Sequence, residues 1–167
     1  MRPFLGLIQL IALDLLYNAL TRIDARTFRD VFFLQILDLR NYTIDRIESN
    51  AFLPLYNLHK LELSKNRLHK QGAQLFNELF VLNRLTLSGN AIASVDPLAF
   101  RDCSNLKELD LSGNELTTMP YALRDLALLK TLDHGENRCN LYKGSFRNFD
   151  QLTGSRFRMT YQKTCTW

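Results

Sequence analysis

The residues most able to do chemistry in this 167-residue chain are acidic side chains that recur at a nearly fixed interval. Five carboxylates and one threonine stand 23 or 24 residues apart: Asp14, Asp38, Glu62, Thr86, Asp110 and Asp133. A row of carboxylates can attract a basic protein surface. The same residues can also be ordinary repeat usage, satisfied by nearby Lys, Arg and Ser side chains, and the sequence leaves both interpretations open.

Residue groupings typical of enzymes are missing from the sequence. The three histidines, His59, His69 and His134, share no metal-ligand spacing. HExxH, CxxC, phosphate-binding glycine and GxSxG motifs are also absent. We therefore predict no catalytic residue, no metal site and no cofactor, and we expect no enzymatic activity.

The carboxylates recur because the whole chain repeats. Runs of the form Leu-x-x-Leu-x-Leu begin at Leu10, Leu34, Leu58, Leu82, Leu106 and Leu129. Four of the steps between these runs are 24 residues long and the last is 23. This period and pattern predict a leucine-rich-repeat solenoid, in which each repeat adds one short strand and buries its apolar face against its neighbours. The carboxylates stand between the last two leucines of each run, so they would point out of the concave face.

Two more columns support the same repeat. An asparagine follows most strands and predicts a hydrogen-bonded ladder where the chain turns: Asn18, Asn66, Asn90, Asn114 and Asn137, with Tyr42 in this place in the second repeat. A phenylalanine column would fill the wider convex side: Phe28, Phe52, Phe76, Phe100 and Phe146. His134 replaces the last leucine of its strand, where it is either a packing defect, partly exposed, or a pH-sensitive group.

We therefore predict an α/β solenoid, a right-handed leucine-rich-repeat coil of about six repeats of 23–24 residues. Its concave face would carry a parallel sheet of short strands, and its convex side mostly loops and short helical turns.

Three segments are expected along the chain. Residues 1–9 read as the return segment of a preceding repeat, because Phe4, Leu7 and Leu10 keep the repeat spacing, although the apolar start also resembles a short signal peptide. Residues 10–152 form the repeat array, and residues 153–167 a degenerate basic tail. Leu152, Ser155 and Phe157 predict a weak seventh strand at their junction. No stretch reaches the roughly 18–20 apolar residues that span a membrane.

Charge and cysteine content separate the array from its tail. The formal charge is +4 overall, but residues 1–137 carry −1 and residues 138–167 carry +5. Cys103 and Cys139 occupy interior columns, which predicts buried thiols, while Cys165 lies in the tail. Nucleic-acid binding is not expected, because the concave strands are acidic and the basic tail has few interleaved aromatic residues.

Several stretches resemble the ectodomains of Toll-family receptors, and of insect Toll paralogues of the Tollo type in particular. They are Asn18-Ala19-Leu20-Thr21-Arg22-Ile23-Asp24, Leu37-Asp38-Leu39-Arg40-Asn41 and Leu85-Thr86-Leu87-Ser88-Gly89-Asn90. The resemblance covers roughly residues 4–153. It implies an extracellular or cell-surface, glycosylated domain that binds a protein ligand or a sister receptor ectodomain in innate immune or developmental signalling. Asn41-Tyr42-Thr43 is an N-glycosylation acceptor, which agrees with that compartment.

Two classes of function stay open. The first is a protein-binding module of a Toll-like receptor that acts through the concave residues Asp14, Asp38, Glu62, Thr86, Asp110 and Asp133, with self-association through uncapped ends. The alternative is an intracellular scaffold of the same repeat, or the recognition arm of an enzyme that lies outside this chain. Glycan occupancy and cellular compartment would separate them.

Overall fold

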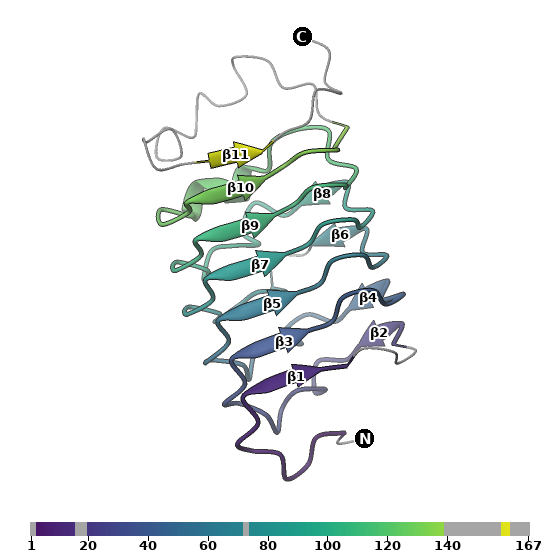
Figure 1. Ribbon diagram of the computed structural model, residues 1–167, viewed down its shortest axis with the longest axis vertical. Coiled ribbons are helices and arrows are strands. Elements are labelled where there is room, and N and C mark those ends of the chain that lie inside the picture. Colours follow the sequence, from purple (N-terminus) through teal and green to yellow (C-terminus); the bar gives the residue numbers. More distant parts are fainter. Residues whose placement is uncertain (1–2, 16–19, 72–73, 139–157, 161–167) are drawn as a thin grey trace.

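The fold is a coil built around one parallel sheet (Figure 1). The computed structural model describes residues 3–15, 20–71, 74–138 and 158–160. Each turn of the coil adds one three-residue strand, and neighbouring strands pair in parallel, one turn after the next. The sheet has seven described strands, namely β1 (Ala12–Asp14), β3 (Ile36–Asp38), β5 (Lys60–Glu62), β7 (Arg84–Thr86), β9 (Glu108–Asp110), β10 (Thr131–Asp133) and β11 (Arg158–Thr160). The predicted leucine-rich-repeat coil is confirmed.

Smaller elements complete each turn. Two-residue strands pair beyond the asparagine column, β2 (Arg22–Ile23) with β4 (Arg46–Ile47) and β6 (Lys70–Gln71) with β8 (Ser94–Val95). Helical structure in the described part is confined to the 3-10 helix η1 (Tyr121–Asp125), which buries Ala122 and Leu123. The remaining return segments are turns, so the helical share of the predicted α/β class is small.

The predicted columns form the core. All three strand leucines of the second to fifth repeats are buried, and each middle leucine stands opposite its equivalent in the next strand. On the return side, Phe4, Phe28, Phe52, Phe76 and Phe100 stack in one column with ring centroids 5.8–6.4 Å apart. Stacking of successive turns, and not any single turn, therefore supplies the apolar core.

The asparagine ladder is confirmed where the structure describes it. Asn90 shows the pattern: its Oδ1 accepts from the Leu68 N–H at 3.1 Å, and its Nδ2 donates to the carbonyls of Leu63 at 3.0 Å and Leu87 at 2.9 Å. Asn66, Asn114 and Asn137 repeat these bonds in their own turns. One amide thus ties two turns together at the strand exit, in a buried place where an unmade backbone bond would be costly.

Two details differ from the sequence prediction. The seventh strand has Met159 opposite Leu132, so the strand comes four residues later than the spacing centred on Ser155 indicates. That register puts an apolar residue type in the leucine column, which Ser155 would have made polar. His134 is 2% exposed, so the prediction of partial exposure at this position was wrong.

Cys103 is buried, as predicted, and its Sγ lies 3.8 Å from the Phe76 carbonyl oxygen. Burial raises the pKa of this thiol to about 12, with a smaller contribution from Asp102. The other predicted members of the columns, Asn18, Cys139 and Phe146, and Cys165 in the tail, lie outside the described residues.

Candidate protein-binding face

The sheet register brings the recurring carboxylates into one row. Asp14 pairs with Asp38, Asp38 with Glu62, Glu62 with Thr86, Thr86 with Asp110, and Asp110 with Asp133. Strands in a parallel sheet lie about 4.8 Å apart, so the six side chains leave the same face at a short, regular spacing. This row, together with the residues on either side of it on the same strands, is called the sheet face below. The predicted juxtaposition of these residues is therefore present.

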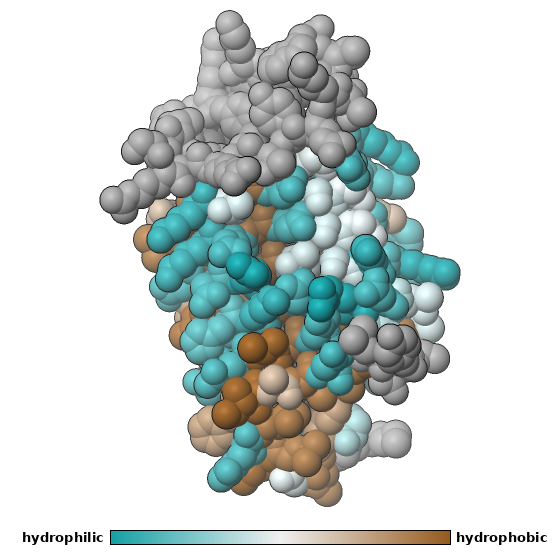
Figure 2. All heavy atoms as spheres, in the orientation of Figure 1, coloured by the Kyte–Doolittle hydropathy of each residue, from teal (hydrophilic) through white to brown (hydrophobic). Residues whose placement is uncertain are grey.

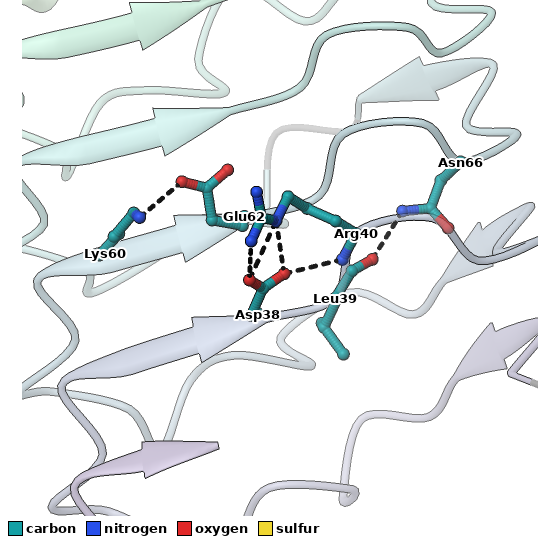
Figure 3. Close-up of polar contacts among 6 residues, drawn as sticks. All are labelled: Asp38, Leu39, Arg40, Lys60, Glu62 and Asn66. Carbon is teal, nitrogen blue, oxygen red and sulfur yellow. Dashed lines mark hydrogen bonds and ion pairs between the residues drawn. The ribbon is translucent and has the colours of Figure 1, made fainter. Parts of the chain in front are cut away.

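The amino-terminal part of the row is largely neutralised (Figure 3). Arg40 contacts Asp38 with its guanidinium, Nη2 lying 2.6 Å and Nε 2.9 Å from Oδ2, and its backbone N–H donates to Oδ1 at 3.1 Å. Partial burial alone would raise the pKa of Asp38, but the hydrogen bonds and charge of Arg40 outweigh it and the pKa is lowered. Within the next strand, β5, Lys60 Nζ lies 2.9 Å from Glu62 Oε1.

The carboxyl-terminal part keeps more of its negative charge. Asp110 accepts hydrogen bonds from the Ser112 N–H at 2.9 Å and from the Ser112 hydroxyl at 2.7 Å, and Asp133 accepts from the Gly135 N–H at 2.9 Å. These bonds hold the carboxylates in place but do not cancel their charge. Among the described side chains, no basic residue forms an ion pair with either Asp110 or Asp133.

A shallow hollow lies within this negative part. It has a volume of about 290 Å³ and opens where the short Thr86 side chain interrupts the row of carboxylates. Arg84 lies at the same place and forms an ion pair with Glu108 on the neighbouring strand. The hollow is lined by Glu62, Arg84, Thr86, Glu108, Asp110, Thr131 and Asp133, and also by Leu85 and Leu109, the middle residues of β7 and β9. Thr86, the uncharged member of the row, is thus one of the residues that line this hollow.

The charge of the whole sheet face can be counted. On the six strands that carry the row (β1, β3, β5, β7, β9 and β10), the strand residues and the second residue after each strand contribute six carboxylates (Asp14, Asp38, Glu62, Glu108, Asp110, Asp133) against Arg40, Lys60 and Arg84, a net of −3. Arg158 on β11 brings the net of the seven-stranded sheet to −2. Such a face is attractive to a basic surface and unfavourable for a phosphate backbone. Asp38, Glu62 and Asp110 are satisfied by Arg40, Lys60 and Ser112, as the interpretation of ordinary repeat usage expects. A role of the row in binding stays a prediction.

The glycosylation acceptor lies at the strand exit, away from the row. Asn41 is exposed, and its φ of 61° places it in the left-handed region that asparagine tolerates. Its backbone N–H donates to the Ser64 carbonyl at 3.1 Å, so the turn is fixed. Thr43 is also exposed, while Tyr42 between them is buried. The side chains that an oligosaccharide transfer reaction must reach are therefore accessible.

Sequence reasoning missed one surface feature. The residue after each of Leu7, Val31, Leu55 and Leu79 is a large exposed hydrophobic side chain. This column consists of Ile8, Phe32, Tyr56 and Phe80. The signal was present in the sequence as a further column with the same 24-residue period. Sequence reasoning did not separate this column, because buried and exposed apolar residues are adjacent in the segment before each strand. Only the burial of each side chain distinguishes the inward residues from the outward ones.

Two features are absent from residues 3–15, 20–71, 74–138 and 158–160. No group of three or more His, Cys, Asp or Glu side chains there is arranged to hold a metal ion. No helix in the same part of the chain has the length and apolarity needed to cross a membrane.

Comparison with known proteins places the chain. Residues 33–92 and 80–138 match the leucine rich repeat family. A 43-residue stretch is 59% identical to Toll-like receptor 7 of Drosophila melanogaster, covering 25% of this chain and 3% of that receptor. The crystal structure of a TLR13–ssRNA13 complex contains a similar coil, with a TM-score of 0.79 and 29% identity over 89% of this chain and 21% of that one. The chain therefore spans a small part of the receptors it matches. It belongs to the leucine-rich-repeat family, and its repeats are similar to those of Toll-like receptor ectodomains.

Proposed function

We propose that this chain is a protein-binding module of the Toll-like receptor type, which recognises a basic surface on a protein ligand or on a sister receptor ectodomain and catalyses nothing. The observation that carries the proposal is the alignment of six outward residues across successive strands, with a negative hollow around Thr86. A partner Lys or Arg side chain entering the hollow would meet Asp110 and Asp133, with which no described basic side chain forms an ion pair. The similarity of its repeats to Toll-like receptor ectodomains supports including in the proposal an extracellular or cell-surface location and a role in innate immune or developmental signalling.

The charge distribution narrows the contact region. Reversing or removing Asp38 or Glu62 would disturb an existing ion pair, because Arg40 and Lys60 already contact them. Removing the charge of Asp110 or Asp133 would instead act directly on an incoming partner. We therefore place the main electrostatic contribution on β9 and β10, with Asp14, Asp38 and Glu62 as neighbouring, partly neutralised members of the site.

A second candidate function is RNA binding, because the similar TLR13 coil is in complex with a single-stranded RNA. The net negative charge of the sheet face disfavours it, because binding of a phosphate backbone depends on neutralisation by Lys and Arg. The experiment below includes single-stranded RNA for this reason.

The test is a binding-kinetics measurement with the double variant Asp110→Asn/Asp133→Asn. Asparagine keeps an acceptor for the Ser112 and Gly135 N–H groups and removes only the charge. Immobilised Toll-type ectodomains, their protein ligands and a single-stranded RNA serve as probes. We expect the association rate for a protein probe to fall several-fold and its dependence on salt to flatten, because exposed charges act mainly on the encounter rate.

The matched control is Asp45→Asn/Asp125→Asn, which removes two exposed carboxylates outside the sheet face. It changes the net charge by the same amount and should leave the association rate nearly unchanged. Equal effects from both variants would show a general charge effect and would remove the sheet face from the site. Binding of RNA alone would transfer the proposal to the second candidate.

We also propose that the chain, when expressed alone, self-associates through the ends of its coil. At the amino-terminal end a hollow of about 870 Å³ is lined by Phe4, Leu15, Leu20, Ile23 and Phe28, among others. Leu10 and Leu13 are only partly buried, unlike their equivalents in later turns. End surfaces of this kind are covered by a further repeat or by a polar cap in solenoid proteins. Concentration-dependent sedimentation of the chain tests this, and a monomer at high concentration would contradict it.

A further inference from the structure

An apolar stripe runs along the edge of the coil where the strands begin. It consists of Ile8, Phe32, Tyr56 and Phe80, one per turn, together with Phe33 beside Phe32, and we call these five residues the apolar rim. Their exposed fractions are 38–52%. Figure 2 shows hydrophobic surface gathered at the amino-terminal end of the coil, with smaller patches along the left margin, where the strands begin. Phe32, Tyr56 and Phe80 are not core residues with incomplete cover, because the core column beside them is fully buried at Val31, Leu55 and Leu79. In the first turn Leu7, the member of that column beside Ile8, is itself 48% exposed.

The backbone under the apolar rim is fixed by two asparagine side chains. Asn57 Nδ2 donates to the Phe32 carbonyl at 3.0 Å, and Asn105 Nδ2 donates to the Phe80 carbonyl at 2.7 Å. Each bond joins the rim of one turn to the next turn. The rings of Phe32 and Phe33 also contact each other, with centroids 5.1 Å apart. The rim thus presents aromatic side chains from a backbone that is held at the coil's own spacing, which lowers the entropy lost when they are covered.

The rim is also free of charge over its first four turns. Each turn has three outward positions at this edge. They are 8, 9 and 11 in the first turn, 32, 33 and 35 in the second, 56, 57 and 59 in the third, and 80, 81 and 83 in the fourth. Among them they hold apolar and aromatic residues, Asn and Gln, and one His, but no Asp, Glu, Lys or Arg. Basic residues enter only at Lys107 and Lys130, in the fifth and sixth turns, where Ser104 and Ala127 replace the large side chains. In the first four turns the large hydrophobic residues therefore lie on an uncharged edge, whereas in the sixth turn the exposed Leu128 lies two residues before Lys130.

The exposed area is large enough to matter. An aromatic side chain buries about 150–250 Å² when covered, so half-exposed rings leave on the order of 100 Å² each. The five rim residues then expose roughly 400–600 Å², at the upper end of the apolar patches found on monomers. A stable interface takes about 800 Å² from each partner. The apolar rim could therefore supply more than half of one side of an interface, with Asn57, His59 and Asn83 as its polar border.

The spacing of the rim identifies what would cover it. Side chains that recur once per coil turn are matched ring for ring only by a surface with the same axial repeat, and a second coil of this repeat has that surface. An uncharged stripe can also meet its own copy without opposing like charges. Turning one copy end over end places Phe32 against the partner's Tyr56 and Ile8 against the partner's Phe80, and leaves Lys107 and Lys130 outside the contact.

We propose that the apolar rim is a self-association surface on which a second copy of this chain packs antiparallel, about a two-fold axis between Phe32 and Tyr56. Such an isologous contact closes at two copies. It is independent of the sheet face, and it differs from association through the coil ends because it uses the side of the coil and not its terminal turn.

The test compares the oligomeric state of the full chain with that of Tyr56→Glu/Phe80→Glu, by sedimentation velocity over a concentration series. The matched control is Leu98→Glu/Tyr121→Glu, whose side chains are 50% and 49% exposed but lie off the rim. We expect the rim variant to raise the dimer dissociation constant at least tenfold and the control to leave it within twofold. A rim variant that dimerises as the wild type does would overturn the proposal and leave the coil ends as the contact.

A cross-linking measurement fixes the geometry. In a background of Cys139→Ser and Cys165→Ser, the variants Phe32→Cys and Tyr56→Cys are oxidised separately and as a mixture, while Cys103 stays buried. The antiparallel contact predicts a disulfide-linked dimer in the mixture and little in either variant alone. Cross-linking that is equal in all three samples, or absent from the mixture, contradicts the arrangement. Association through the coil ends alone gives no cross-link at these positions.

Discussion

Removing one amide from the asparagine ladder should destabilise the coil far more than removing an exposed one. In Asn90→Ala the Leu68 N–H loses the side-chain acceptor that lies 3.1 Å away in a buried turn. A buried donor left without a partner costs about 1–3 kcal/mol. The carbonyls of Leu63 and Leu87 lose one bond each but keep those from Asn66 at 3.0 Å and from Asn114 at 3.0 Å. Adding those smaller losses gives about 2–4 kcal/mol for the substitution.

The control has the same chemistry at the surface. Asn105 is exposed and makes one side-chain bond, to the Phe80 carbonyl, so Asn105→Ala should cost about 0.5–1 kcal/mol. Urea titration followed by far-ultraviolet circular dichroism gives the two losses, and amide exchange of Leu68 reports the site itself. The Ile44 N–H, which donates to Asn66, serves as an internal reference. Equal losses for the two variants, with unchanged exchange at Leu68, would refute the ladder as a source of stability.

Two further predictions concern His134 and Asn41. Burial lowers the pKa of His134 from its usual 6.5, so the unfolded chain takes up a proton at a pH where the folded chain does not. The stability of the fold is therefore not reduced by this histidine above pH 6.5, and it falls as the pH drops below that value. His134→Leu should raise the urea midpoint of unfolding. It should also flatten the dependence of that midpoint on pH between pH 7.5 and 5.5. If the chain is made in a secretory host, we predict a glycan at Asn41, seen by intact mass and lost in Thr43→Ala, which keeps the asparagine in its left-handed turn; an unchanged mass in that variant would place any glycan elsewhere.

The repeat made much of the architecture predictable. A buried leucine at each middle strand position, an asparagine at each exit and a stacked phenylalanine on the return side follow from spacing alone, because each column has one physical role in every turn. Prediction was weaker where the column and the residue type disagree. His134 reads as a defect to be exposed, yet the coil buries it with the leucines it replaces. The last strand follows Met159 and not the fixed spacing, since an apolar residue type in the leucine column outweighs regular length.

The candidate site was predictable in position and not in charge. The spacing of Asp14 to Asp133 determined that these residues would share a face. It did not show that Arg40 would fold back on Asp38 while Asp110 would be held by Ser112, because both partners stand two residues beyond their carboxylate. The same offset gives a neutral pair in one repeat and a hydrogen-bonded but charged group in another. The residue type at that offset, Arg or Ser, therefore decides how much negative charge each repeat shows to a partner.

The strand exits with Asn41, the apolar rim and the sheet face are three separate surfaces of the coil. Their arrangement makes partner binding on the sheet face compatible with dimerisation through the apolar rim. A glycan at Asn41 would stand at the strand exits, whereas the apolar rim lies where the strands begin, at the other end of each strand. Glycosylation would therefore leave the rim uncovered. Antiparallel packing of two rims brings together the sides of the two coils on which the strands begin, and it leaves Asp110 and Asp133 uncovered on the sheet faces. A dimer of this kind would present two negative hollows at a fixed separation, so a partner with two basic sites would gain from the second contact without any new interaction at the first.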